Sequence, residues 1–403
     1  MAPQETRRPL AWHLLLVLLG VVLAVRAWPH LTTATTSFPG YWTVARLILE
    51  GTPAVDLYQG DVLARRLATE GFSGDRMLGP PGLALTLLPL AWLPYRVART
   101  VWMLGLLVPA LALSLTWLGR RVGGGAGVAF ALLWAWSRPV QAGFEVGQVY
   151  PLFLGLHCLA LRAWEGDARR LGGLALAPLL FLRGWHGLPQ AFGWLWSRRP
   201  AGALWAGLGV GALVVTTLPL LGVASWRHFV LVHAREAAQS ETASALAYQT
   251  WRSLALHLTT SHPQYSPAPP LVGLGPWPWL VGVAAIAIAS LWATRRLAPQ
   301  DPLGFAIWTL VATLLAPFAE DHQLVLVALP AAALWRRMPG ARALVAVALL
   351  LLLPAWRFTD PALSPGWAAL WAYPRVYGML LLWVGAVAAA GRSPGEGSAA
   401  TAR

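Results

Sequence analysis

The feature that most constrains this chain is a repeated alternation of long apolar runs with short connections that carry arginine. Runs such as Leu14–Val25, Ala201–Leu221 and Leu271–Trp292 contain no charged residue. Several of them approach the ~20 residues that an α-helix needs to cross the hydrocarbon core of a bilayer. Since the sequence is 57% hydrophobic and only 11% charged, we expect an all-α polytopic membrane protein.

The positive charge of the chain fits membrane orientation better than nucleic-acid binding. In a soluble protein the formal net charge of +14 would suggest a nucleic-acid partner. Here the arginines come as pairs at the ends of apolar runs, and cytoplasmic helix ends are enriched in such residues. We therefore expect the lipid bilayer as a partner and no nucleic acid. Oligomeric state is not indicated by the sequence.

Arginine placement also predicts the topology. If every arginine pair is cytoplasmic, both termini lie in the cytoplasm and about twelve helices cross the membrane. For the first run a cleaved secretory signal is the alternative, but the many later runs favour an uncleaved helix. The predicted helices are 11–28, 97–118, 123–137, 149–164, 171–183, 187–196, 201–221, 271–293, 303–317, 323–335, 342–355 and 369–390.

Three of these helices, 123–137, 171–183 and 187–196, are too short to span the membrane alone. Short or broken helices are tolerated where protein or a water-filled cavity shields them, which suggests a cavity inside the bundle. We expect one membrane domain over residues 1–392, followed by a disordered tail over 393–403. The proline-rich stretch Pro80–Pro94 is predicted as a dipping or interfacial helix on the outer side.

Two long connections, 29–96 and 222–270, lie outside the cell in this topology. In the first, apolar residues from Tyr41 to Leu49 recur at helical spacing, and a second short helix is predicted from Asp61 to Glu70. In the second, a similar stripe follows Ser225, which is predicted as its N-cap. These helices either lie flat on the membrane surface or form a small cap packed on itself, and the sequence leaves both open.

Few ionisable residues occur beside the short helices, and such residues are costly near hydrocarbon. They fall in three clusters that map to the outer face, where convergence would form one site at the mouth of the bundle. Alternatives are an ion pair between Glu145 and Arg183, a helix cap at Asp321, and packing roles for the histidines. The clusters contain Glu145, then Arg183 and His186, then Glu320, Asp321 and His322. Metal-ligand spacing and a phosphate loop are absent from the sequence, so no cofactor is expected.

Five sequence patterns occur in an order that resembles glycosyltransferase family 87, the polyprenyl-phosphate-sugar mannosyltransferases of the membrane-embedded GT-C class. The resemblance covers most of the chain. Each pattern is weak alone, but their order is moderately specific. They are Ser37–Arg46 with Gly51 and Tyr58, Gly79-Pro80-Pro81 with its apolar continuation to Pro94, Gly147-Gln148, Arg183 to Pro189, and Ala316-Pro317 through His322.

The resemblance implies an inverting hexosyltransferase in the inner membrane of a bacterium. It would move mannose or a similar sugar from a polyprenyl-phosphate donor to a lipid or cell-envelope glycan on the extracytoplasmic face. The family carries an acidic base where this chain has Ser37, and serine is not a base at neutral pH without help. The implied site residues are Asp56, Glu145 or Asp321 as base, Arg183 and Arg252 on the phosphate, and Tyr41, Trp42, Gln148, His186 and His322 on the substrate.

Two rival interpretations stay open at this point. One is a secondary transporter or flippase of a lipid-linked substrate, which would also use broken helices and charges near the membrane midplane. The other is a catalytically inactive family member, which the serine at position 37 would suit. Related halves would favour the transporter, whereas the long outer loops sit at unrelated positions in the chain.

Overall fold

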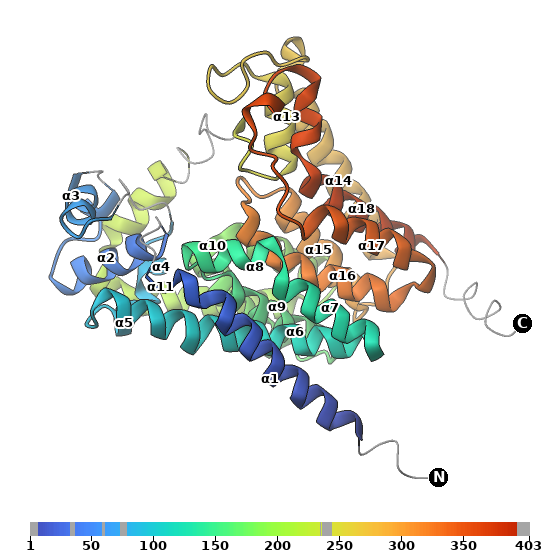
Figure 1. Ribbon diagram of the computed structural model, residues 1–403, viewed down its shortest axis with the longest axis horizontal. Helices are drawn as coiled ribbons and strands as arrows, with labels where there is room; N and C mark the ends of the chain where they lie inside the picture. The colour runs from blue at the N-terminus through green and yellow to red at the C-terminus, as the bar shows by residue number, and fades with distance from the viewer. Residues whose placement is uncertain are drawn as a thin grey trace, which may run out of the picture. The chain divides into compact units, whose positions relative to one another are not determined.

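The computed structural model describes residues 7–32, 37–58, 61–72, 79–233, 235 and 244–392, and every regular element in them is helical (Figure 1). The predicted tail at 393–403 and part of the connection 222–270 lie outside these residues. Five described helices are long and apolar enough to cross a membrane. The chain is therefore a polytopic membrane protein. These candidate spans are Leu10–His30, Tyr95–Val122, Pro200–Val232, Trp277–Arg295 and Pro374–Gly391.

Every predicted helix has a helical counterpart, but the boundaries shift where glycine or proline intervenes. The predicted helix 271–293 begins later, as α14 (Trp277–Arg295), because Gly275 has a positive φ and Pro276 precedes the first turn. The predicted helix 323–335 begins as a 3₁₀ segment, η8 (Asp321–Val327), before α16 (Ala328–Arg337). The number of helices that span the membrane, and their sidedness, stay predictions.

The chain forms two compact units. Unit 1 comprises Met1–Cys158, Leu174–Gly184 and Ala206–Ser240, and unit 2 comprises Leu159–Gly173, Trp185–Trp205 and Glu241–Arg403. Three helices contribute residues to both units, namely α9 (Tyr150–Glu165), α10 (Arg169–Trp196) and α11 (Pro200–His228).

In unit 1, α1 (Arg7–Ala27), α6 (Val108–Val122) and α7 (Gly124–Trp136) pack against one another. A Cβ added at Gly119 would lie 2.7 Å from the carbonyl oxygen of Gly127, so these glycines let α6 and α7 approach closely. α6 continues α5 (Tyr95–Thr100) through a π-helical segment, η4 (Val101–Leu107).

The first long connection folds as a small helical layer in unit 1. It contains α2 (Ser37–Leu49), the turn η2 (Asp56–Tyr58) and α3 (Asp61–Thr69), which confirms both predicted helices. α2 packs against α3, α4 (Gly82–Leu85), η3 (Leu88–Leu90) and α5. Most of its side chains are buried, which agrees with a cap packed on itself. The stretch Pro80–Pro94 forms only short turns, too short to cross a membrane.

Unit 2 is built from α13 (Trp251–Thr259), α14, α15 (Pro302–Leu314), α16, α17 (Arg342–Leu352) and α18 (Pro374–Gly391). α15 contacts α14, α16 and α18, and α17 packs along α18. Nearly all of α15 is buried, so it forms the centre of this unit.

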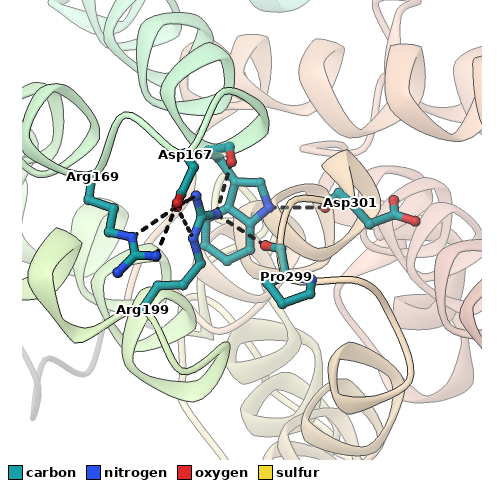
Figure 2. Close-up of polar contacts among 6 residues, drawn as sticks. Asp167, Arg169, Arg199, Pro299 and Asp301 are labelled. Atoms are coloured by element: carbon teal, nitrogen blue, oxygen red, sulfur yellow. Dashed lines mark hydrogen bonds and ion pairs between the residues drawn. The ribbon is translucent and has the colours of Figure 1, made fainter.

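A buried arginine joins three connections of unit 2 (Figure 2). Arg199 is 2% exposed and its Nε donates to Asp167 at 2.8 Å. Its Nη1 donates to the carbonyl oxygens of Trp164 and Pro299. Hydrogen bonds from Arg169 and Arg199 lower the pKa of Asp167 to about 2. Trp164 is a packing residue, because it is 1% exposed beneath Arg199.

α10 contains a break at Arg183, whose φ of −157° and ψ of 75° are not helical. A straight helix would separate residues 172 and 194 by about 33 Å. Instead, a Cβ on Gly172 would lie 2.5 Å from the Trp194 ring. The chain therefore turns back on itself near Arg183, in agreement with the two short helices predicted at 171–183 and 187–196.

Two local predictions were wrong or incomplete. Ser225 is not an N-cap, because it lies inside α11 and its hydroxyl donates to the carbonyl oxygen of Leu221. The helix α8 (Arg138–Val146) was not predicted, since its apolar face is short and polar residues interrupt it. Its N-cap is Ser137, whose Oγ accepts from the backbone N–H of Val140, and Gly147 ends it in the left-handed conformation.

Candidate active site

Four residues from three of the sequence patterns form one hydrogen-bonded chain in unit 1. Arg183 Nη2 donates to the hydroxyl of Tyr41 at 2.9 Å. That hydroxyl donates to Gln148 Oε1 at 3.1 Å, and Gln148 Nε2 donates to Ser37 Oγ at 2.9 Å. We call this set the relay. Tyr41 accepts one hydrogen bond and donates the next, so it fixes which end of the Gln148 amide faces Ser37.

The backbone at Gly147 brings Gln148 against the start of α2. Gly147 has φ +68°, and a Cβ placed on it would lie 2.7 Å from the Cβ of Phe38. Only glycine fits both the conformation and the contact. Gln148 is 5% exposed, whereas its partners Ser37 and Tyr41 are half-buried. Residues 37 and 38 of α2 therefore meet residues 148 and 147 after α8.

The proline-rich pattern packs on the same region. Tyr58 donates to the carbonyl oxygen of Gly79 at 2.8 Å, and burial raises the pKa of Tyr58, so its phenol stays a donor. A Cβ on Gly82 would collide with the ring of Phe181, two residues before Arg183. Residues of four of the five patterns that carry the family resemblance are thus brought together in unit 1.

Residues 78–319 match glycosyltransferase family 87, which is more than half of the chain. The chain belongs to glycosyltransferase family 87. The family match includes Gln148 and Arg183, whereas Ser37 and Tyr41 precede it and His322 follows it. No curated protein and no solved structure gives a match to the chain. Membership in family 87 makes this protein a membrane glycosyltransferase.

The three carboxylates predicted as bases in this family 87 protein differ in their surroundings. Glu145 accepts from Arg138 Nη1 at 2.6 Å. Asp321 forms an ion pair with Arg375. It does not act as the N-cap of a helix at His322, because η8 begins at Asp321 itself. Asp56 is half-buried at the start of η2 and forms no ion pair among the described residues.

The remaining predicted residues occupy buried positions. Trp42 is 1% exposed and packs against Tyr95, Phe72 and Arg46. These are packing contacts, and its role on a sugar stays a prediction. His186 is fully buried in unit 2.

The last sequence pattern lies in unit 2 and is fixed by contacts from the second long connection. The backbone N–H of Gln249 donates to the carbonyl oxygen of Ala319 at 2.7 Å. The guanidinium of Arg252 lies over the ring of Phe318, and His322 lies 3.6 Å from Glu320. Arg252, Asp321 and His322 therefore all lie in this unit.

Sequence reasoning missed two arginines that are completely buried, Arg99 and Arg375. Each donates to backbone carbonyl oxygens at the C-terminal end of a helix: Arg99 to Phe144 and Glu145 of α8, and Arg375 to Leu352 of α17. Arg99 lies over the ring of Phe38, and Arg375 lies over the ring of Phe358. The sequence signal that could have identified both residues is a single arginine, without an adjacent arginine, close to an apolar run.

Proposed function

We propose that this family 87 enzyme moves mannose or a similar sugar from a polyprenyl-phosphate donor to a lipid or cell-envelope glycan on the extracytoplasmic face. The single observation that carries the proposal is the relay. Ser37, Tyr41, Gln148 and Arg183 are separated in sequence, yet they form one hydrogen-bonded chain beside the proline-rich pattern.

In this proposal Arg183 binds the donor phosphate. A guanidinium pairs with phosphate oxygens bidentately, and its positive charge stabilises the negative charge that develops as the phosphate leaves. The hydrogen bond to Tyr41 directs the guanidinium. The arms of α10 on either side of Arg183 are each about 20 Å long, shorter than the bilayer core. Such a break would suit a lipid-linked donor whose phosphate lies below the membrane surface.

A carboxylate would remove the proton from the acceptor hydroxyl while that oxygen attacks the anomeric carbon. The bond from the anomeric carbon to the phosphate oxygen then breaks, and the configuration inverts. Glu145 and Asp321 are each already paired with an arginine, whereas Asp56 forms no ion pair among the described residues, so Asp56 is the favoured base.

The other polar residues complete the proposal. Gln148 and Tyr41 would orient the sugar hydroxyls, with Trp42 supporting them from the packed layer. His186, Arg252 and His322 lie in unit 2, and their roles, with Arg252 on the phosphate and the two histidines on the substrate, stay predictions. No resident cofactor is needed, because the lipid-linked donor supplies the activated sugar.

The test is sugar transfer by the purified protein from polyprenyl-phosphate-mannose to a broad pool of lipid and glycan acceptors. Asp56→Asn should lose most of the rate, and Glu145→Gln should lose less. Arg183→Ala should change the envelope glycans of cells. If the wild-type protein transfers no sugar and Arg183→Ala alters no glycan, the proposal is wrong. Donor binding without turnover would instead indicate an inactive family member.

A further inference from the structure

We infer that Arg99 is a positioning residue, which sets Ser37 and Gln148 against each other by holding their chain neighbours Phe38 and Gly147. The catalytic consequence rests on the proposed function, whereas the geometric consequence does not. Arg99 lies in α5, is 0% exposed, and belongs to none of the sequence patterns that carry the family resemblance.

The guanidinium of Arg99 connects three separate segments of unit 1. Its Nε donates to the carbonyl oxygen of His30 at 2.7 Å, after α1. Its Nη2 donates to the carbonyl oxygens of Phe144 and Glu145 at 3.3 and 3.0 Å, in the last turn of α8. A positive charge is favourable there, because the last carbonyl groups of a helix lack intrahelical partners and carry partial negative charge.

The third segment is the start of α2. Arg99 lies 5.5 Å from the centroid of the Phe38 ring, and the Cβ of Phe38 closely approaches Gly147. A Cβ built on Gly147 would also lie 3.5 Å from Arg99 Nη1. Peptide planes are rigid, so holding Phe38 and Gly147 limits where Ser37 and Gln148 can lie.

Two further residues on the same helix face support Arg99. Tyr95 and Trp102 are four residues before and three residues after it, a spacing that places all three on one face. The Tyr95 hydroxyl accepts from Arg99 Nη1 at 3.2 Å, and its ring packs on Phe38 and Trp42. Trp102 Nε1 donates to the carbonyl oxygen of Gly147 at 2.9 Å. This helix face therefore contacts both Phe38, which follows Ser37, and Gly147, which precedes Gln148.

The arrangement requires arginine rather than any cation. A guanidinium is planar and points its N–H groups in several fixed directions, whereas a lysine ammonium is a single point at the end of a flexible stem. Lysine could reach one or two of these carbonyl oxygens but could not cover the Phe38 ring at the same time. We therefore expect Arg99→Lys to retain part of the positioning and Arg99→Met to lose most of it.

A crosslinking experiment tests the geometry without relying on activity. Ser37→Cys and Gln148→Cys are introduced together with Cys158→Ser, and the full-length protein in membranes is treated with a short bifunctional thiol reagent. Arg99→Met should slow crosslinking at least fivefold, and Arg99→Lys should fall between. The matched control is Arg96→Met, since Arg96 lies in the same helix but is exposed. Thermal unfolding in detergent is measured for every variant.

Unchanged crosslinking in Arg99→Met would overturn the inference, and so would a loss that only follows the loss of folded protein. In the enzyme with native residues 37 and 148, Arg99→Met should lower kcat for transfer from polyprenyl-phosphate-mannose at least tenfold, with donor KM within about threefold, because small misplacements cost rate more than binding. Absence of any transfer by the wild-type protein would count against the proposed function, while crosslinking would still decide the positioning.

Discussion

The hydroxyl of Tyr41 accepts a hydrogen bond from Arg183 at 2.9 Å, although 142 residues separate the two in the chain. This bond joins the first long connection to the break in α10. Tyr41 then donates to Gln148, so the relay has a direction that ends at Ser37.

Tyr41→Phe should lower the rate of sugar transfer by about thirtyfold, because it removes two hydrogen bonds worth on the order of 1 kcal/mol each but keeps the ring. Initial rates with polyprenyl-phosphate-mannose measure the effect. Tyr265→Phe, a tyrosine of unit 2 outside the relay, serves as the control. Equal rates for wild type and Tyr41→Phe would show that the relay is not used in transfer.

Ser37→Asp should raise the rate of transfer, because it places a carboxylate where Gln148 Nε2 already donates. As the carboxylate must be ionised to act as a base, the gain should be present at neutral pH and disappear as the pH falls through its pKa. Ser37→Asn has a similar size without basicity. If Asp and Asn at this position give the same rate at every pH, a carboxylate base at residue 37 does not contribute to transfer.

Gly147→Ala should destabilise the protein by about 1–3 kcal/mol, since a side chain is strained at positive φ and the added Cβ would meet Phe38 at 2.7 Å. Unfolding in detergent is the measurement. Gly20→Ala is the matched control, because a Cβ there meets nothing within 4 Å and alanine favours the helix. Equal stability of the two variants would contradict the tight contact between Gly147 and Phe38.

Asp321→Asn should destabilise the protein by about 3–5 kcal/mol, because it leaves the buried charge of Arg375 without its carboxylate. Asp56→Asn, by contrast, should leave the unfolding temperature nearly unchanged while removing activity. The double variant Asp321→Leu/Arg375→Met should recover much of the stability, since both charges are removed together. A stable Asp321→Asn protein that has lost only activity would restore Asp321 as the base.

The Asp167 site predicts a pH-dependent stability. Its folded-state pKa of about 2 is below the ordinary value of about 3.9. Its contribution is therefore present above pH ~4 and is lost as the pH falls toward ~2. Asp167→Asn should lower the unfolding temperature at pH 7, and its difference from wild type should shrink below pH ~4.

The two arginines around Asp167 provide an internal comparison. Arg199→Gln should be more damaging than Arg169→Gln, because the Arg199 side chain is 3% exposed and that of Arg169 is 43% exposed. Both variants are measured in the same detergent at pH 7. Equal destabilisation would show that burial of Arg199 contributes nothing beyond the ion pair.

The amino-acid sequence alone determined the class of the molecule and the place of nearly every helix. Long uncharged apolar runs are stable only inside a membrane or a protein core. Arginine, glycine and proline mark the ends of these runs, so each helix can be predicted from its own stretch of sequence. The break at Arg183 and the helices of the first long connection were predicted for the same reason. The order of the motifs also indicated the family, because each motif is a continuous stretch of sequence.

Only the tertiary structure decided which polar groups are partners. Glu145 pairs with Arg138, Asp321 with Arg375, and Gln148 with Ser37 and Tyr41. The role of Arg99 could not be read from sequence, since its partners are backbone carbonyl oxygens of distant segments. A carbonyl group is present at every residue and leaves no signal in the sequence. Packing alone determines which of them a buried guanidinium reaches.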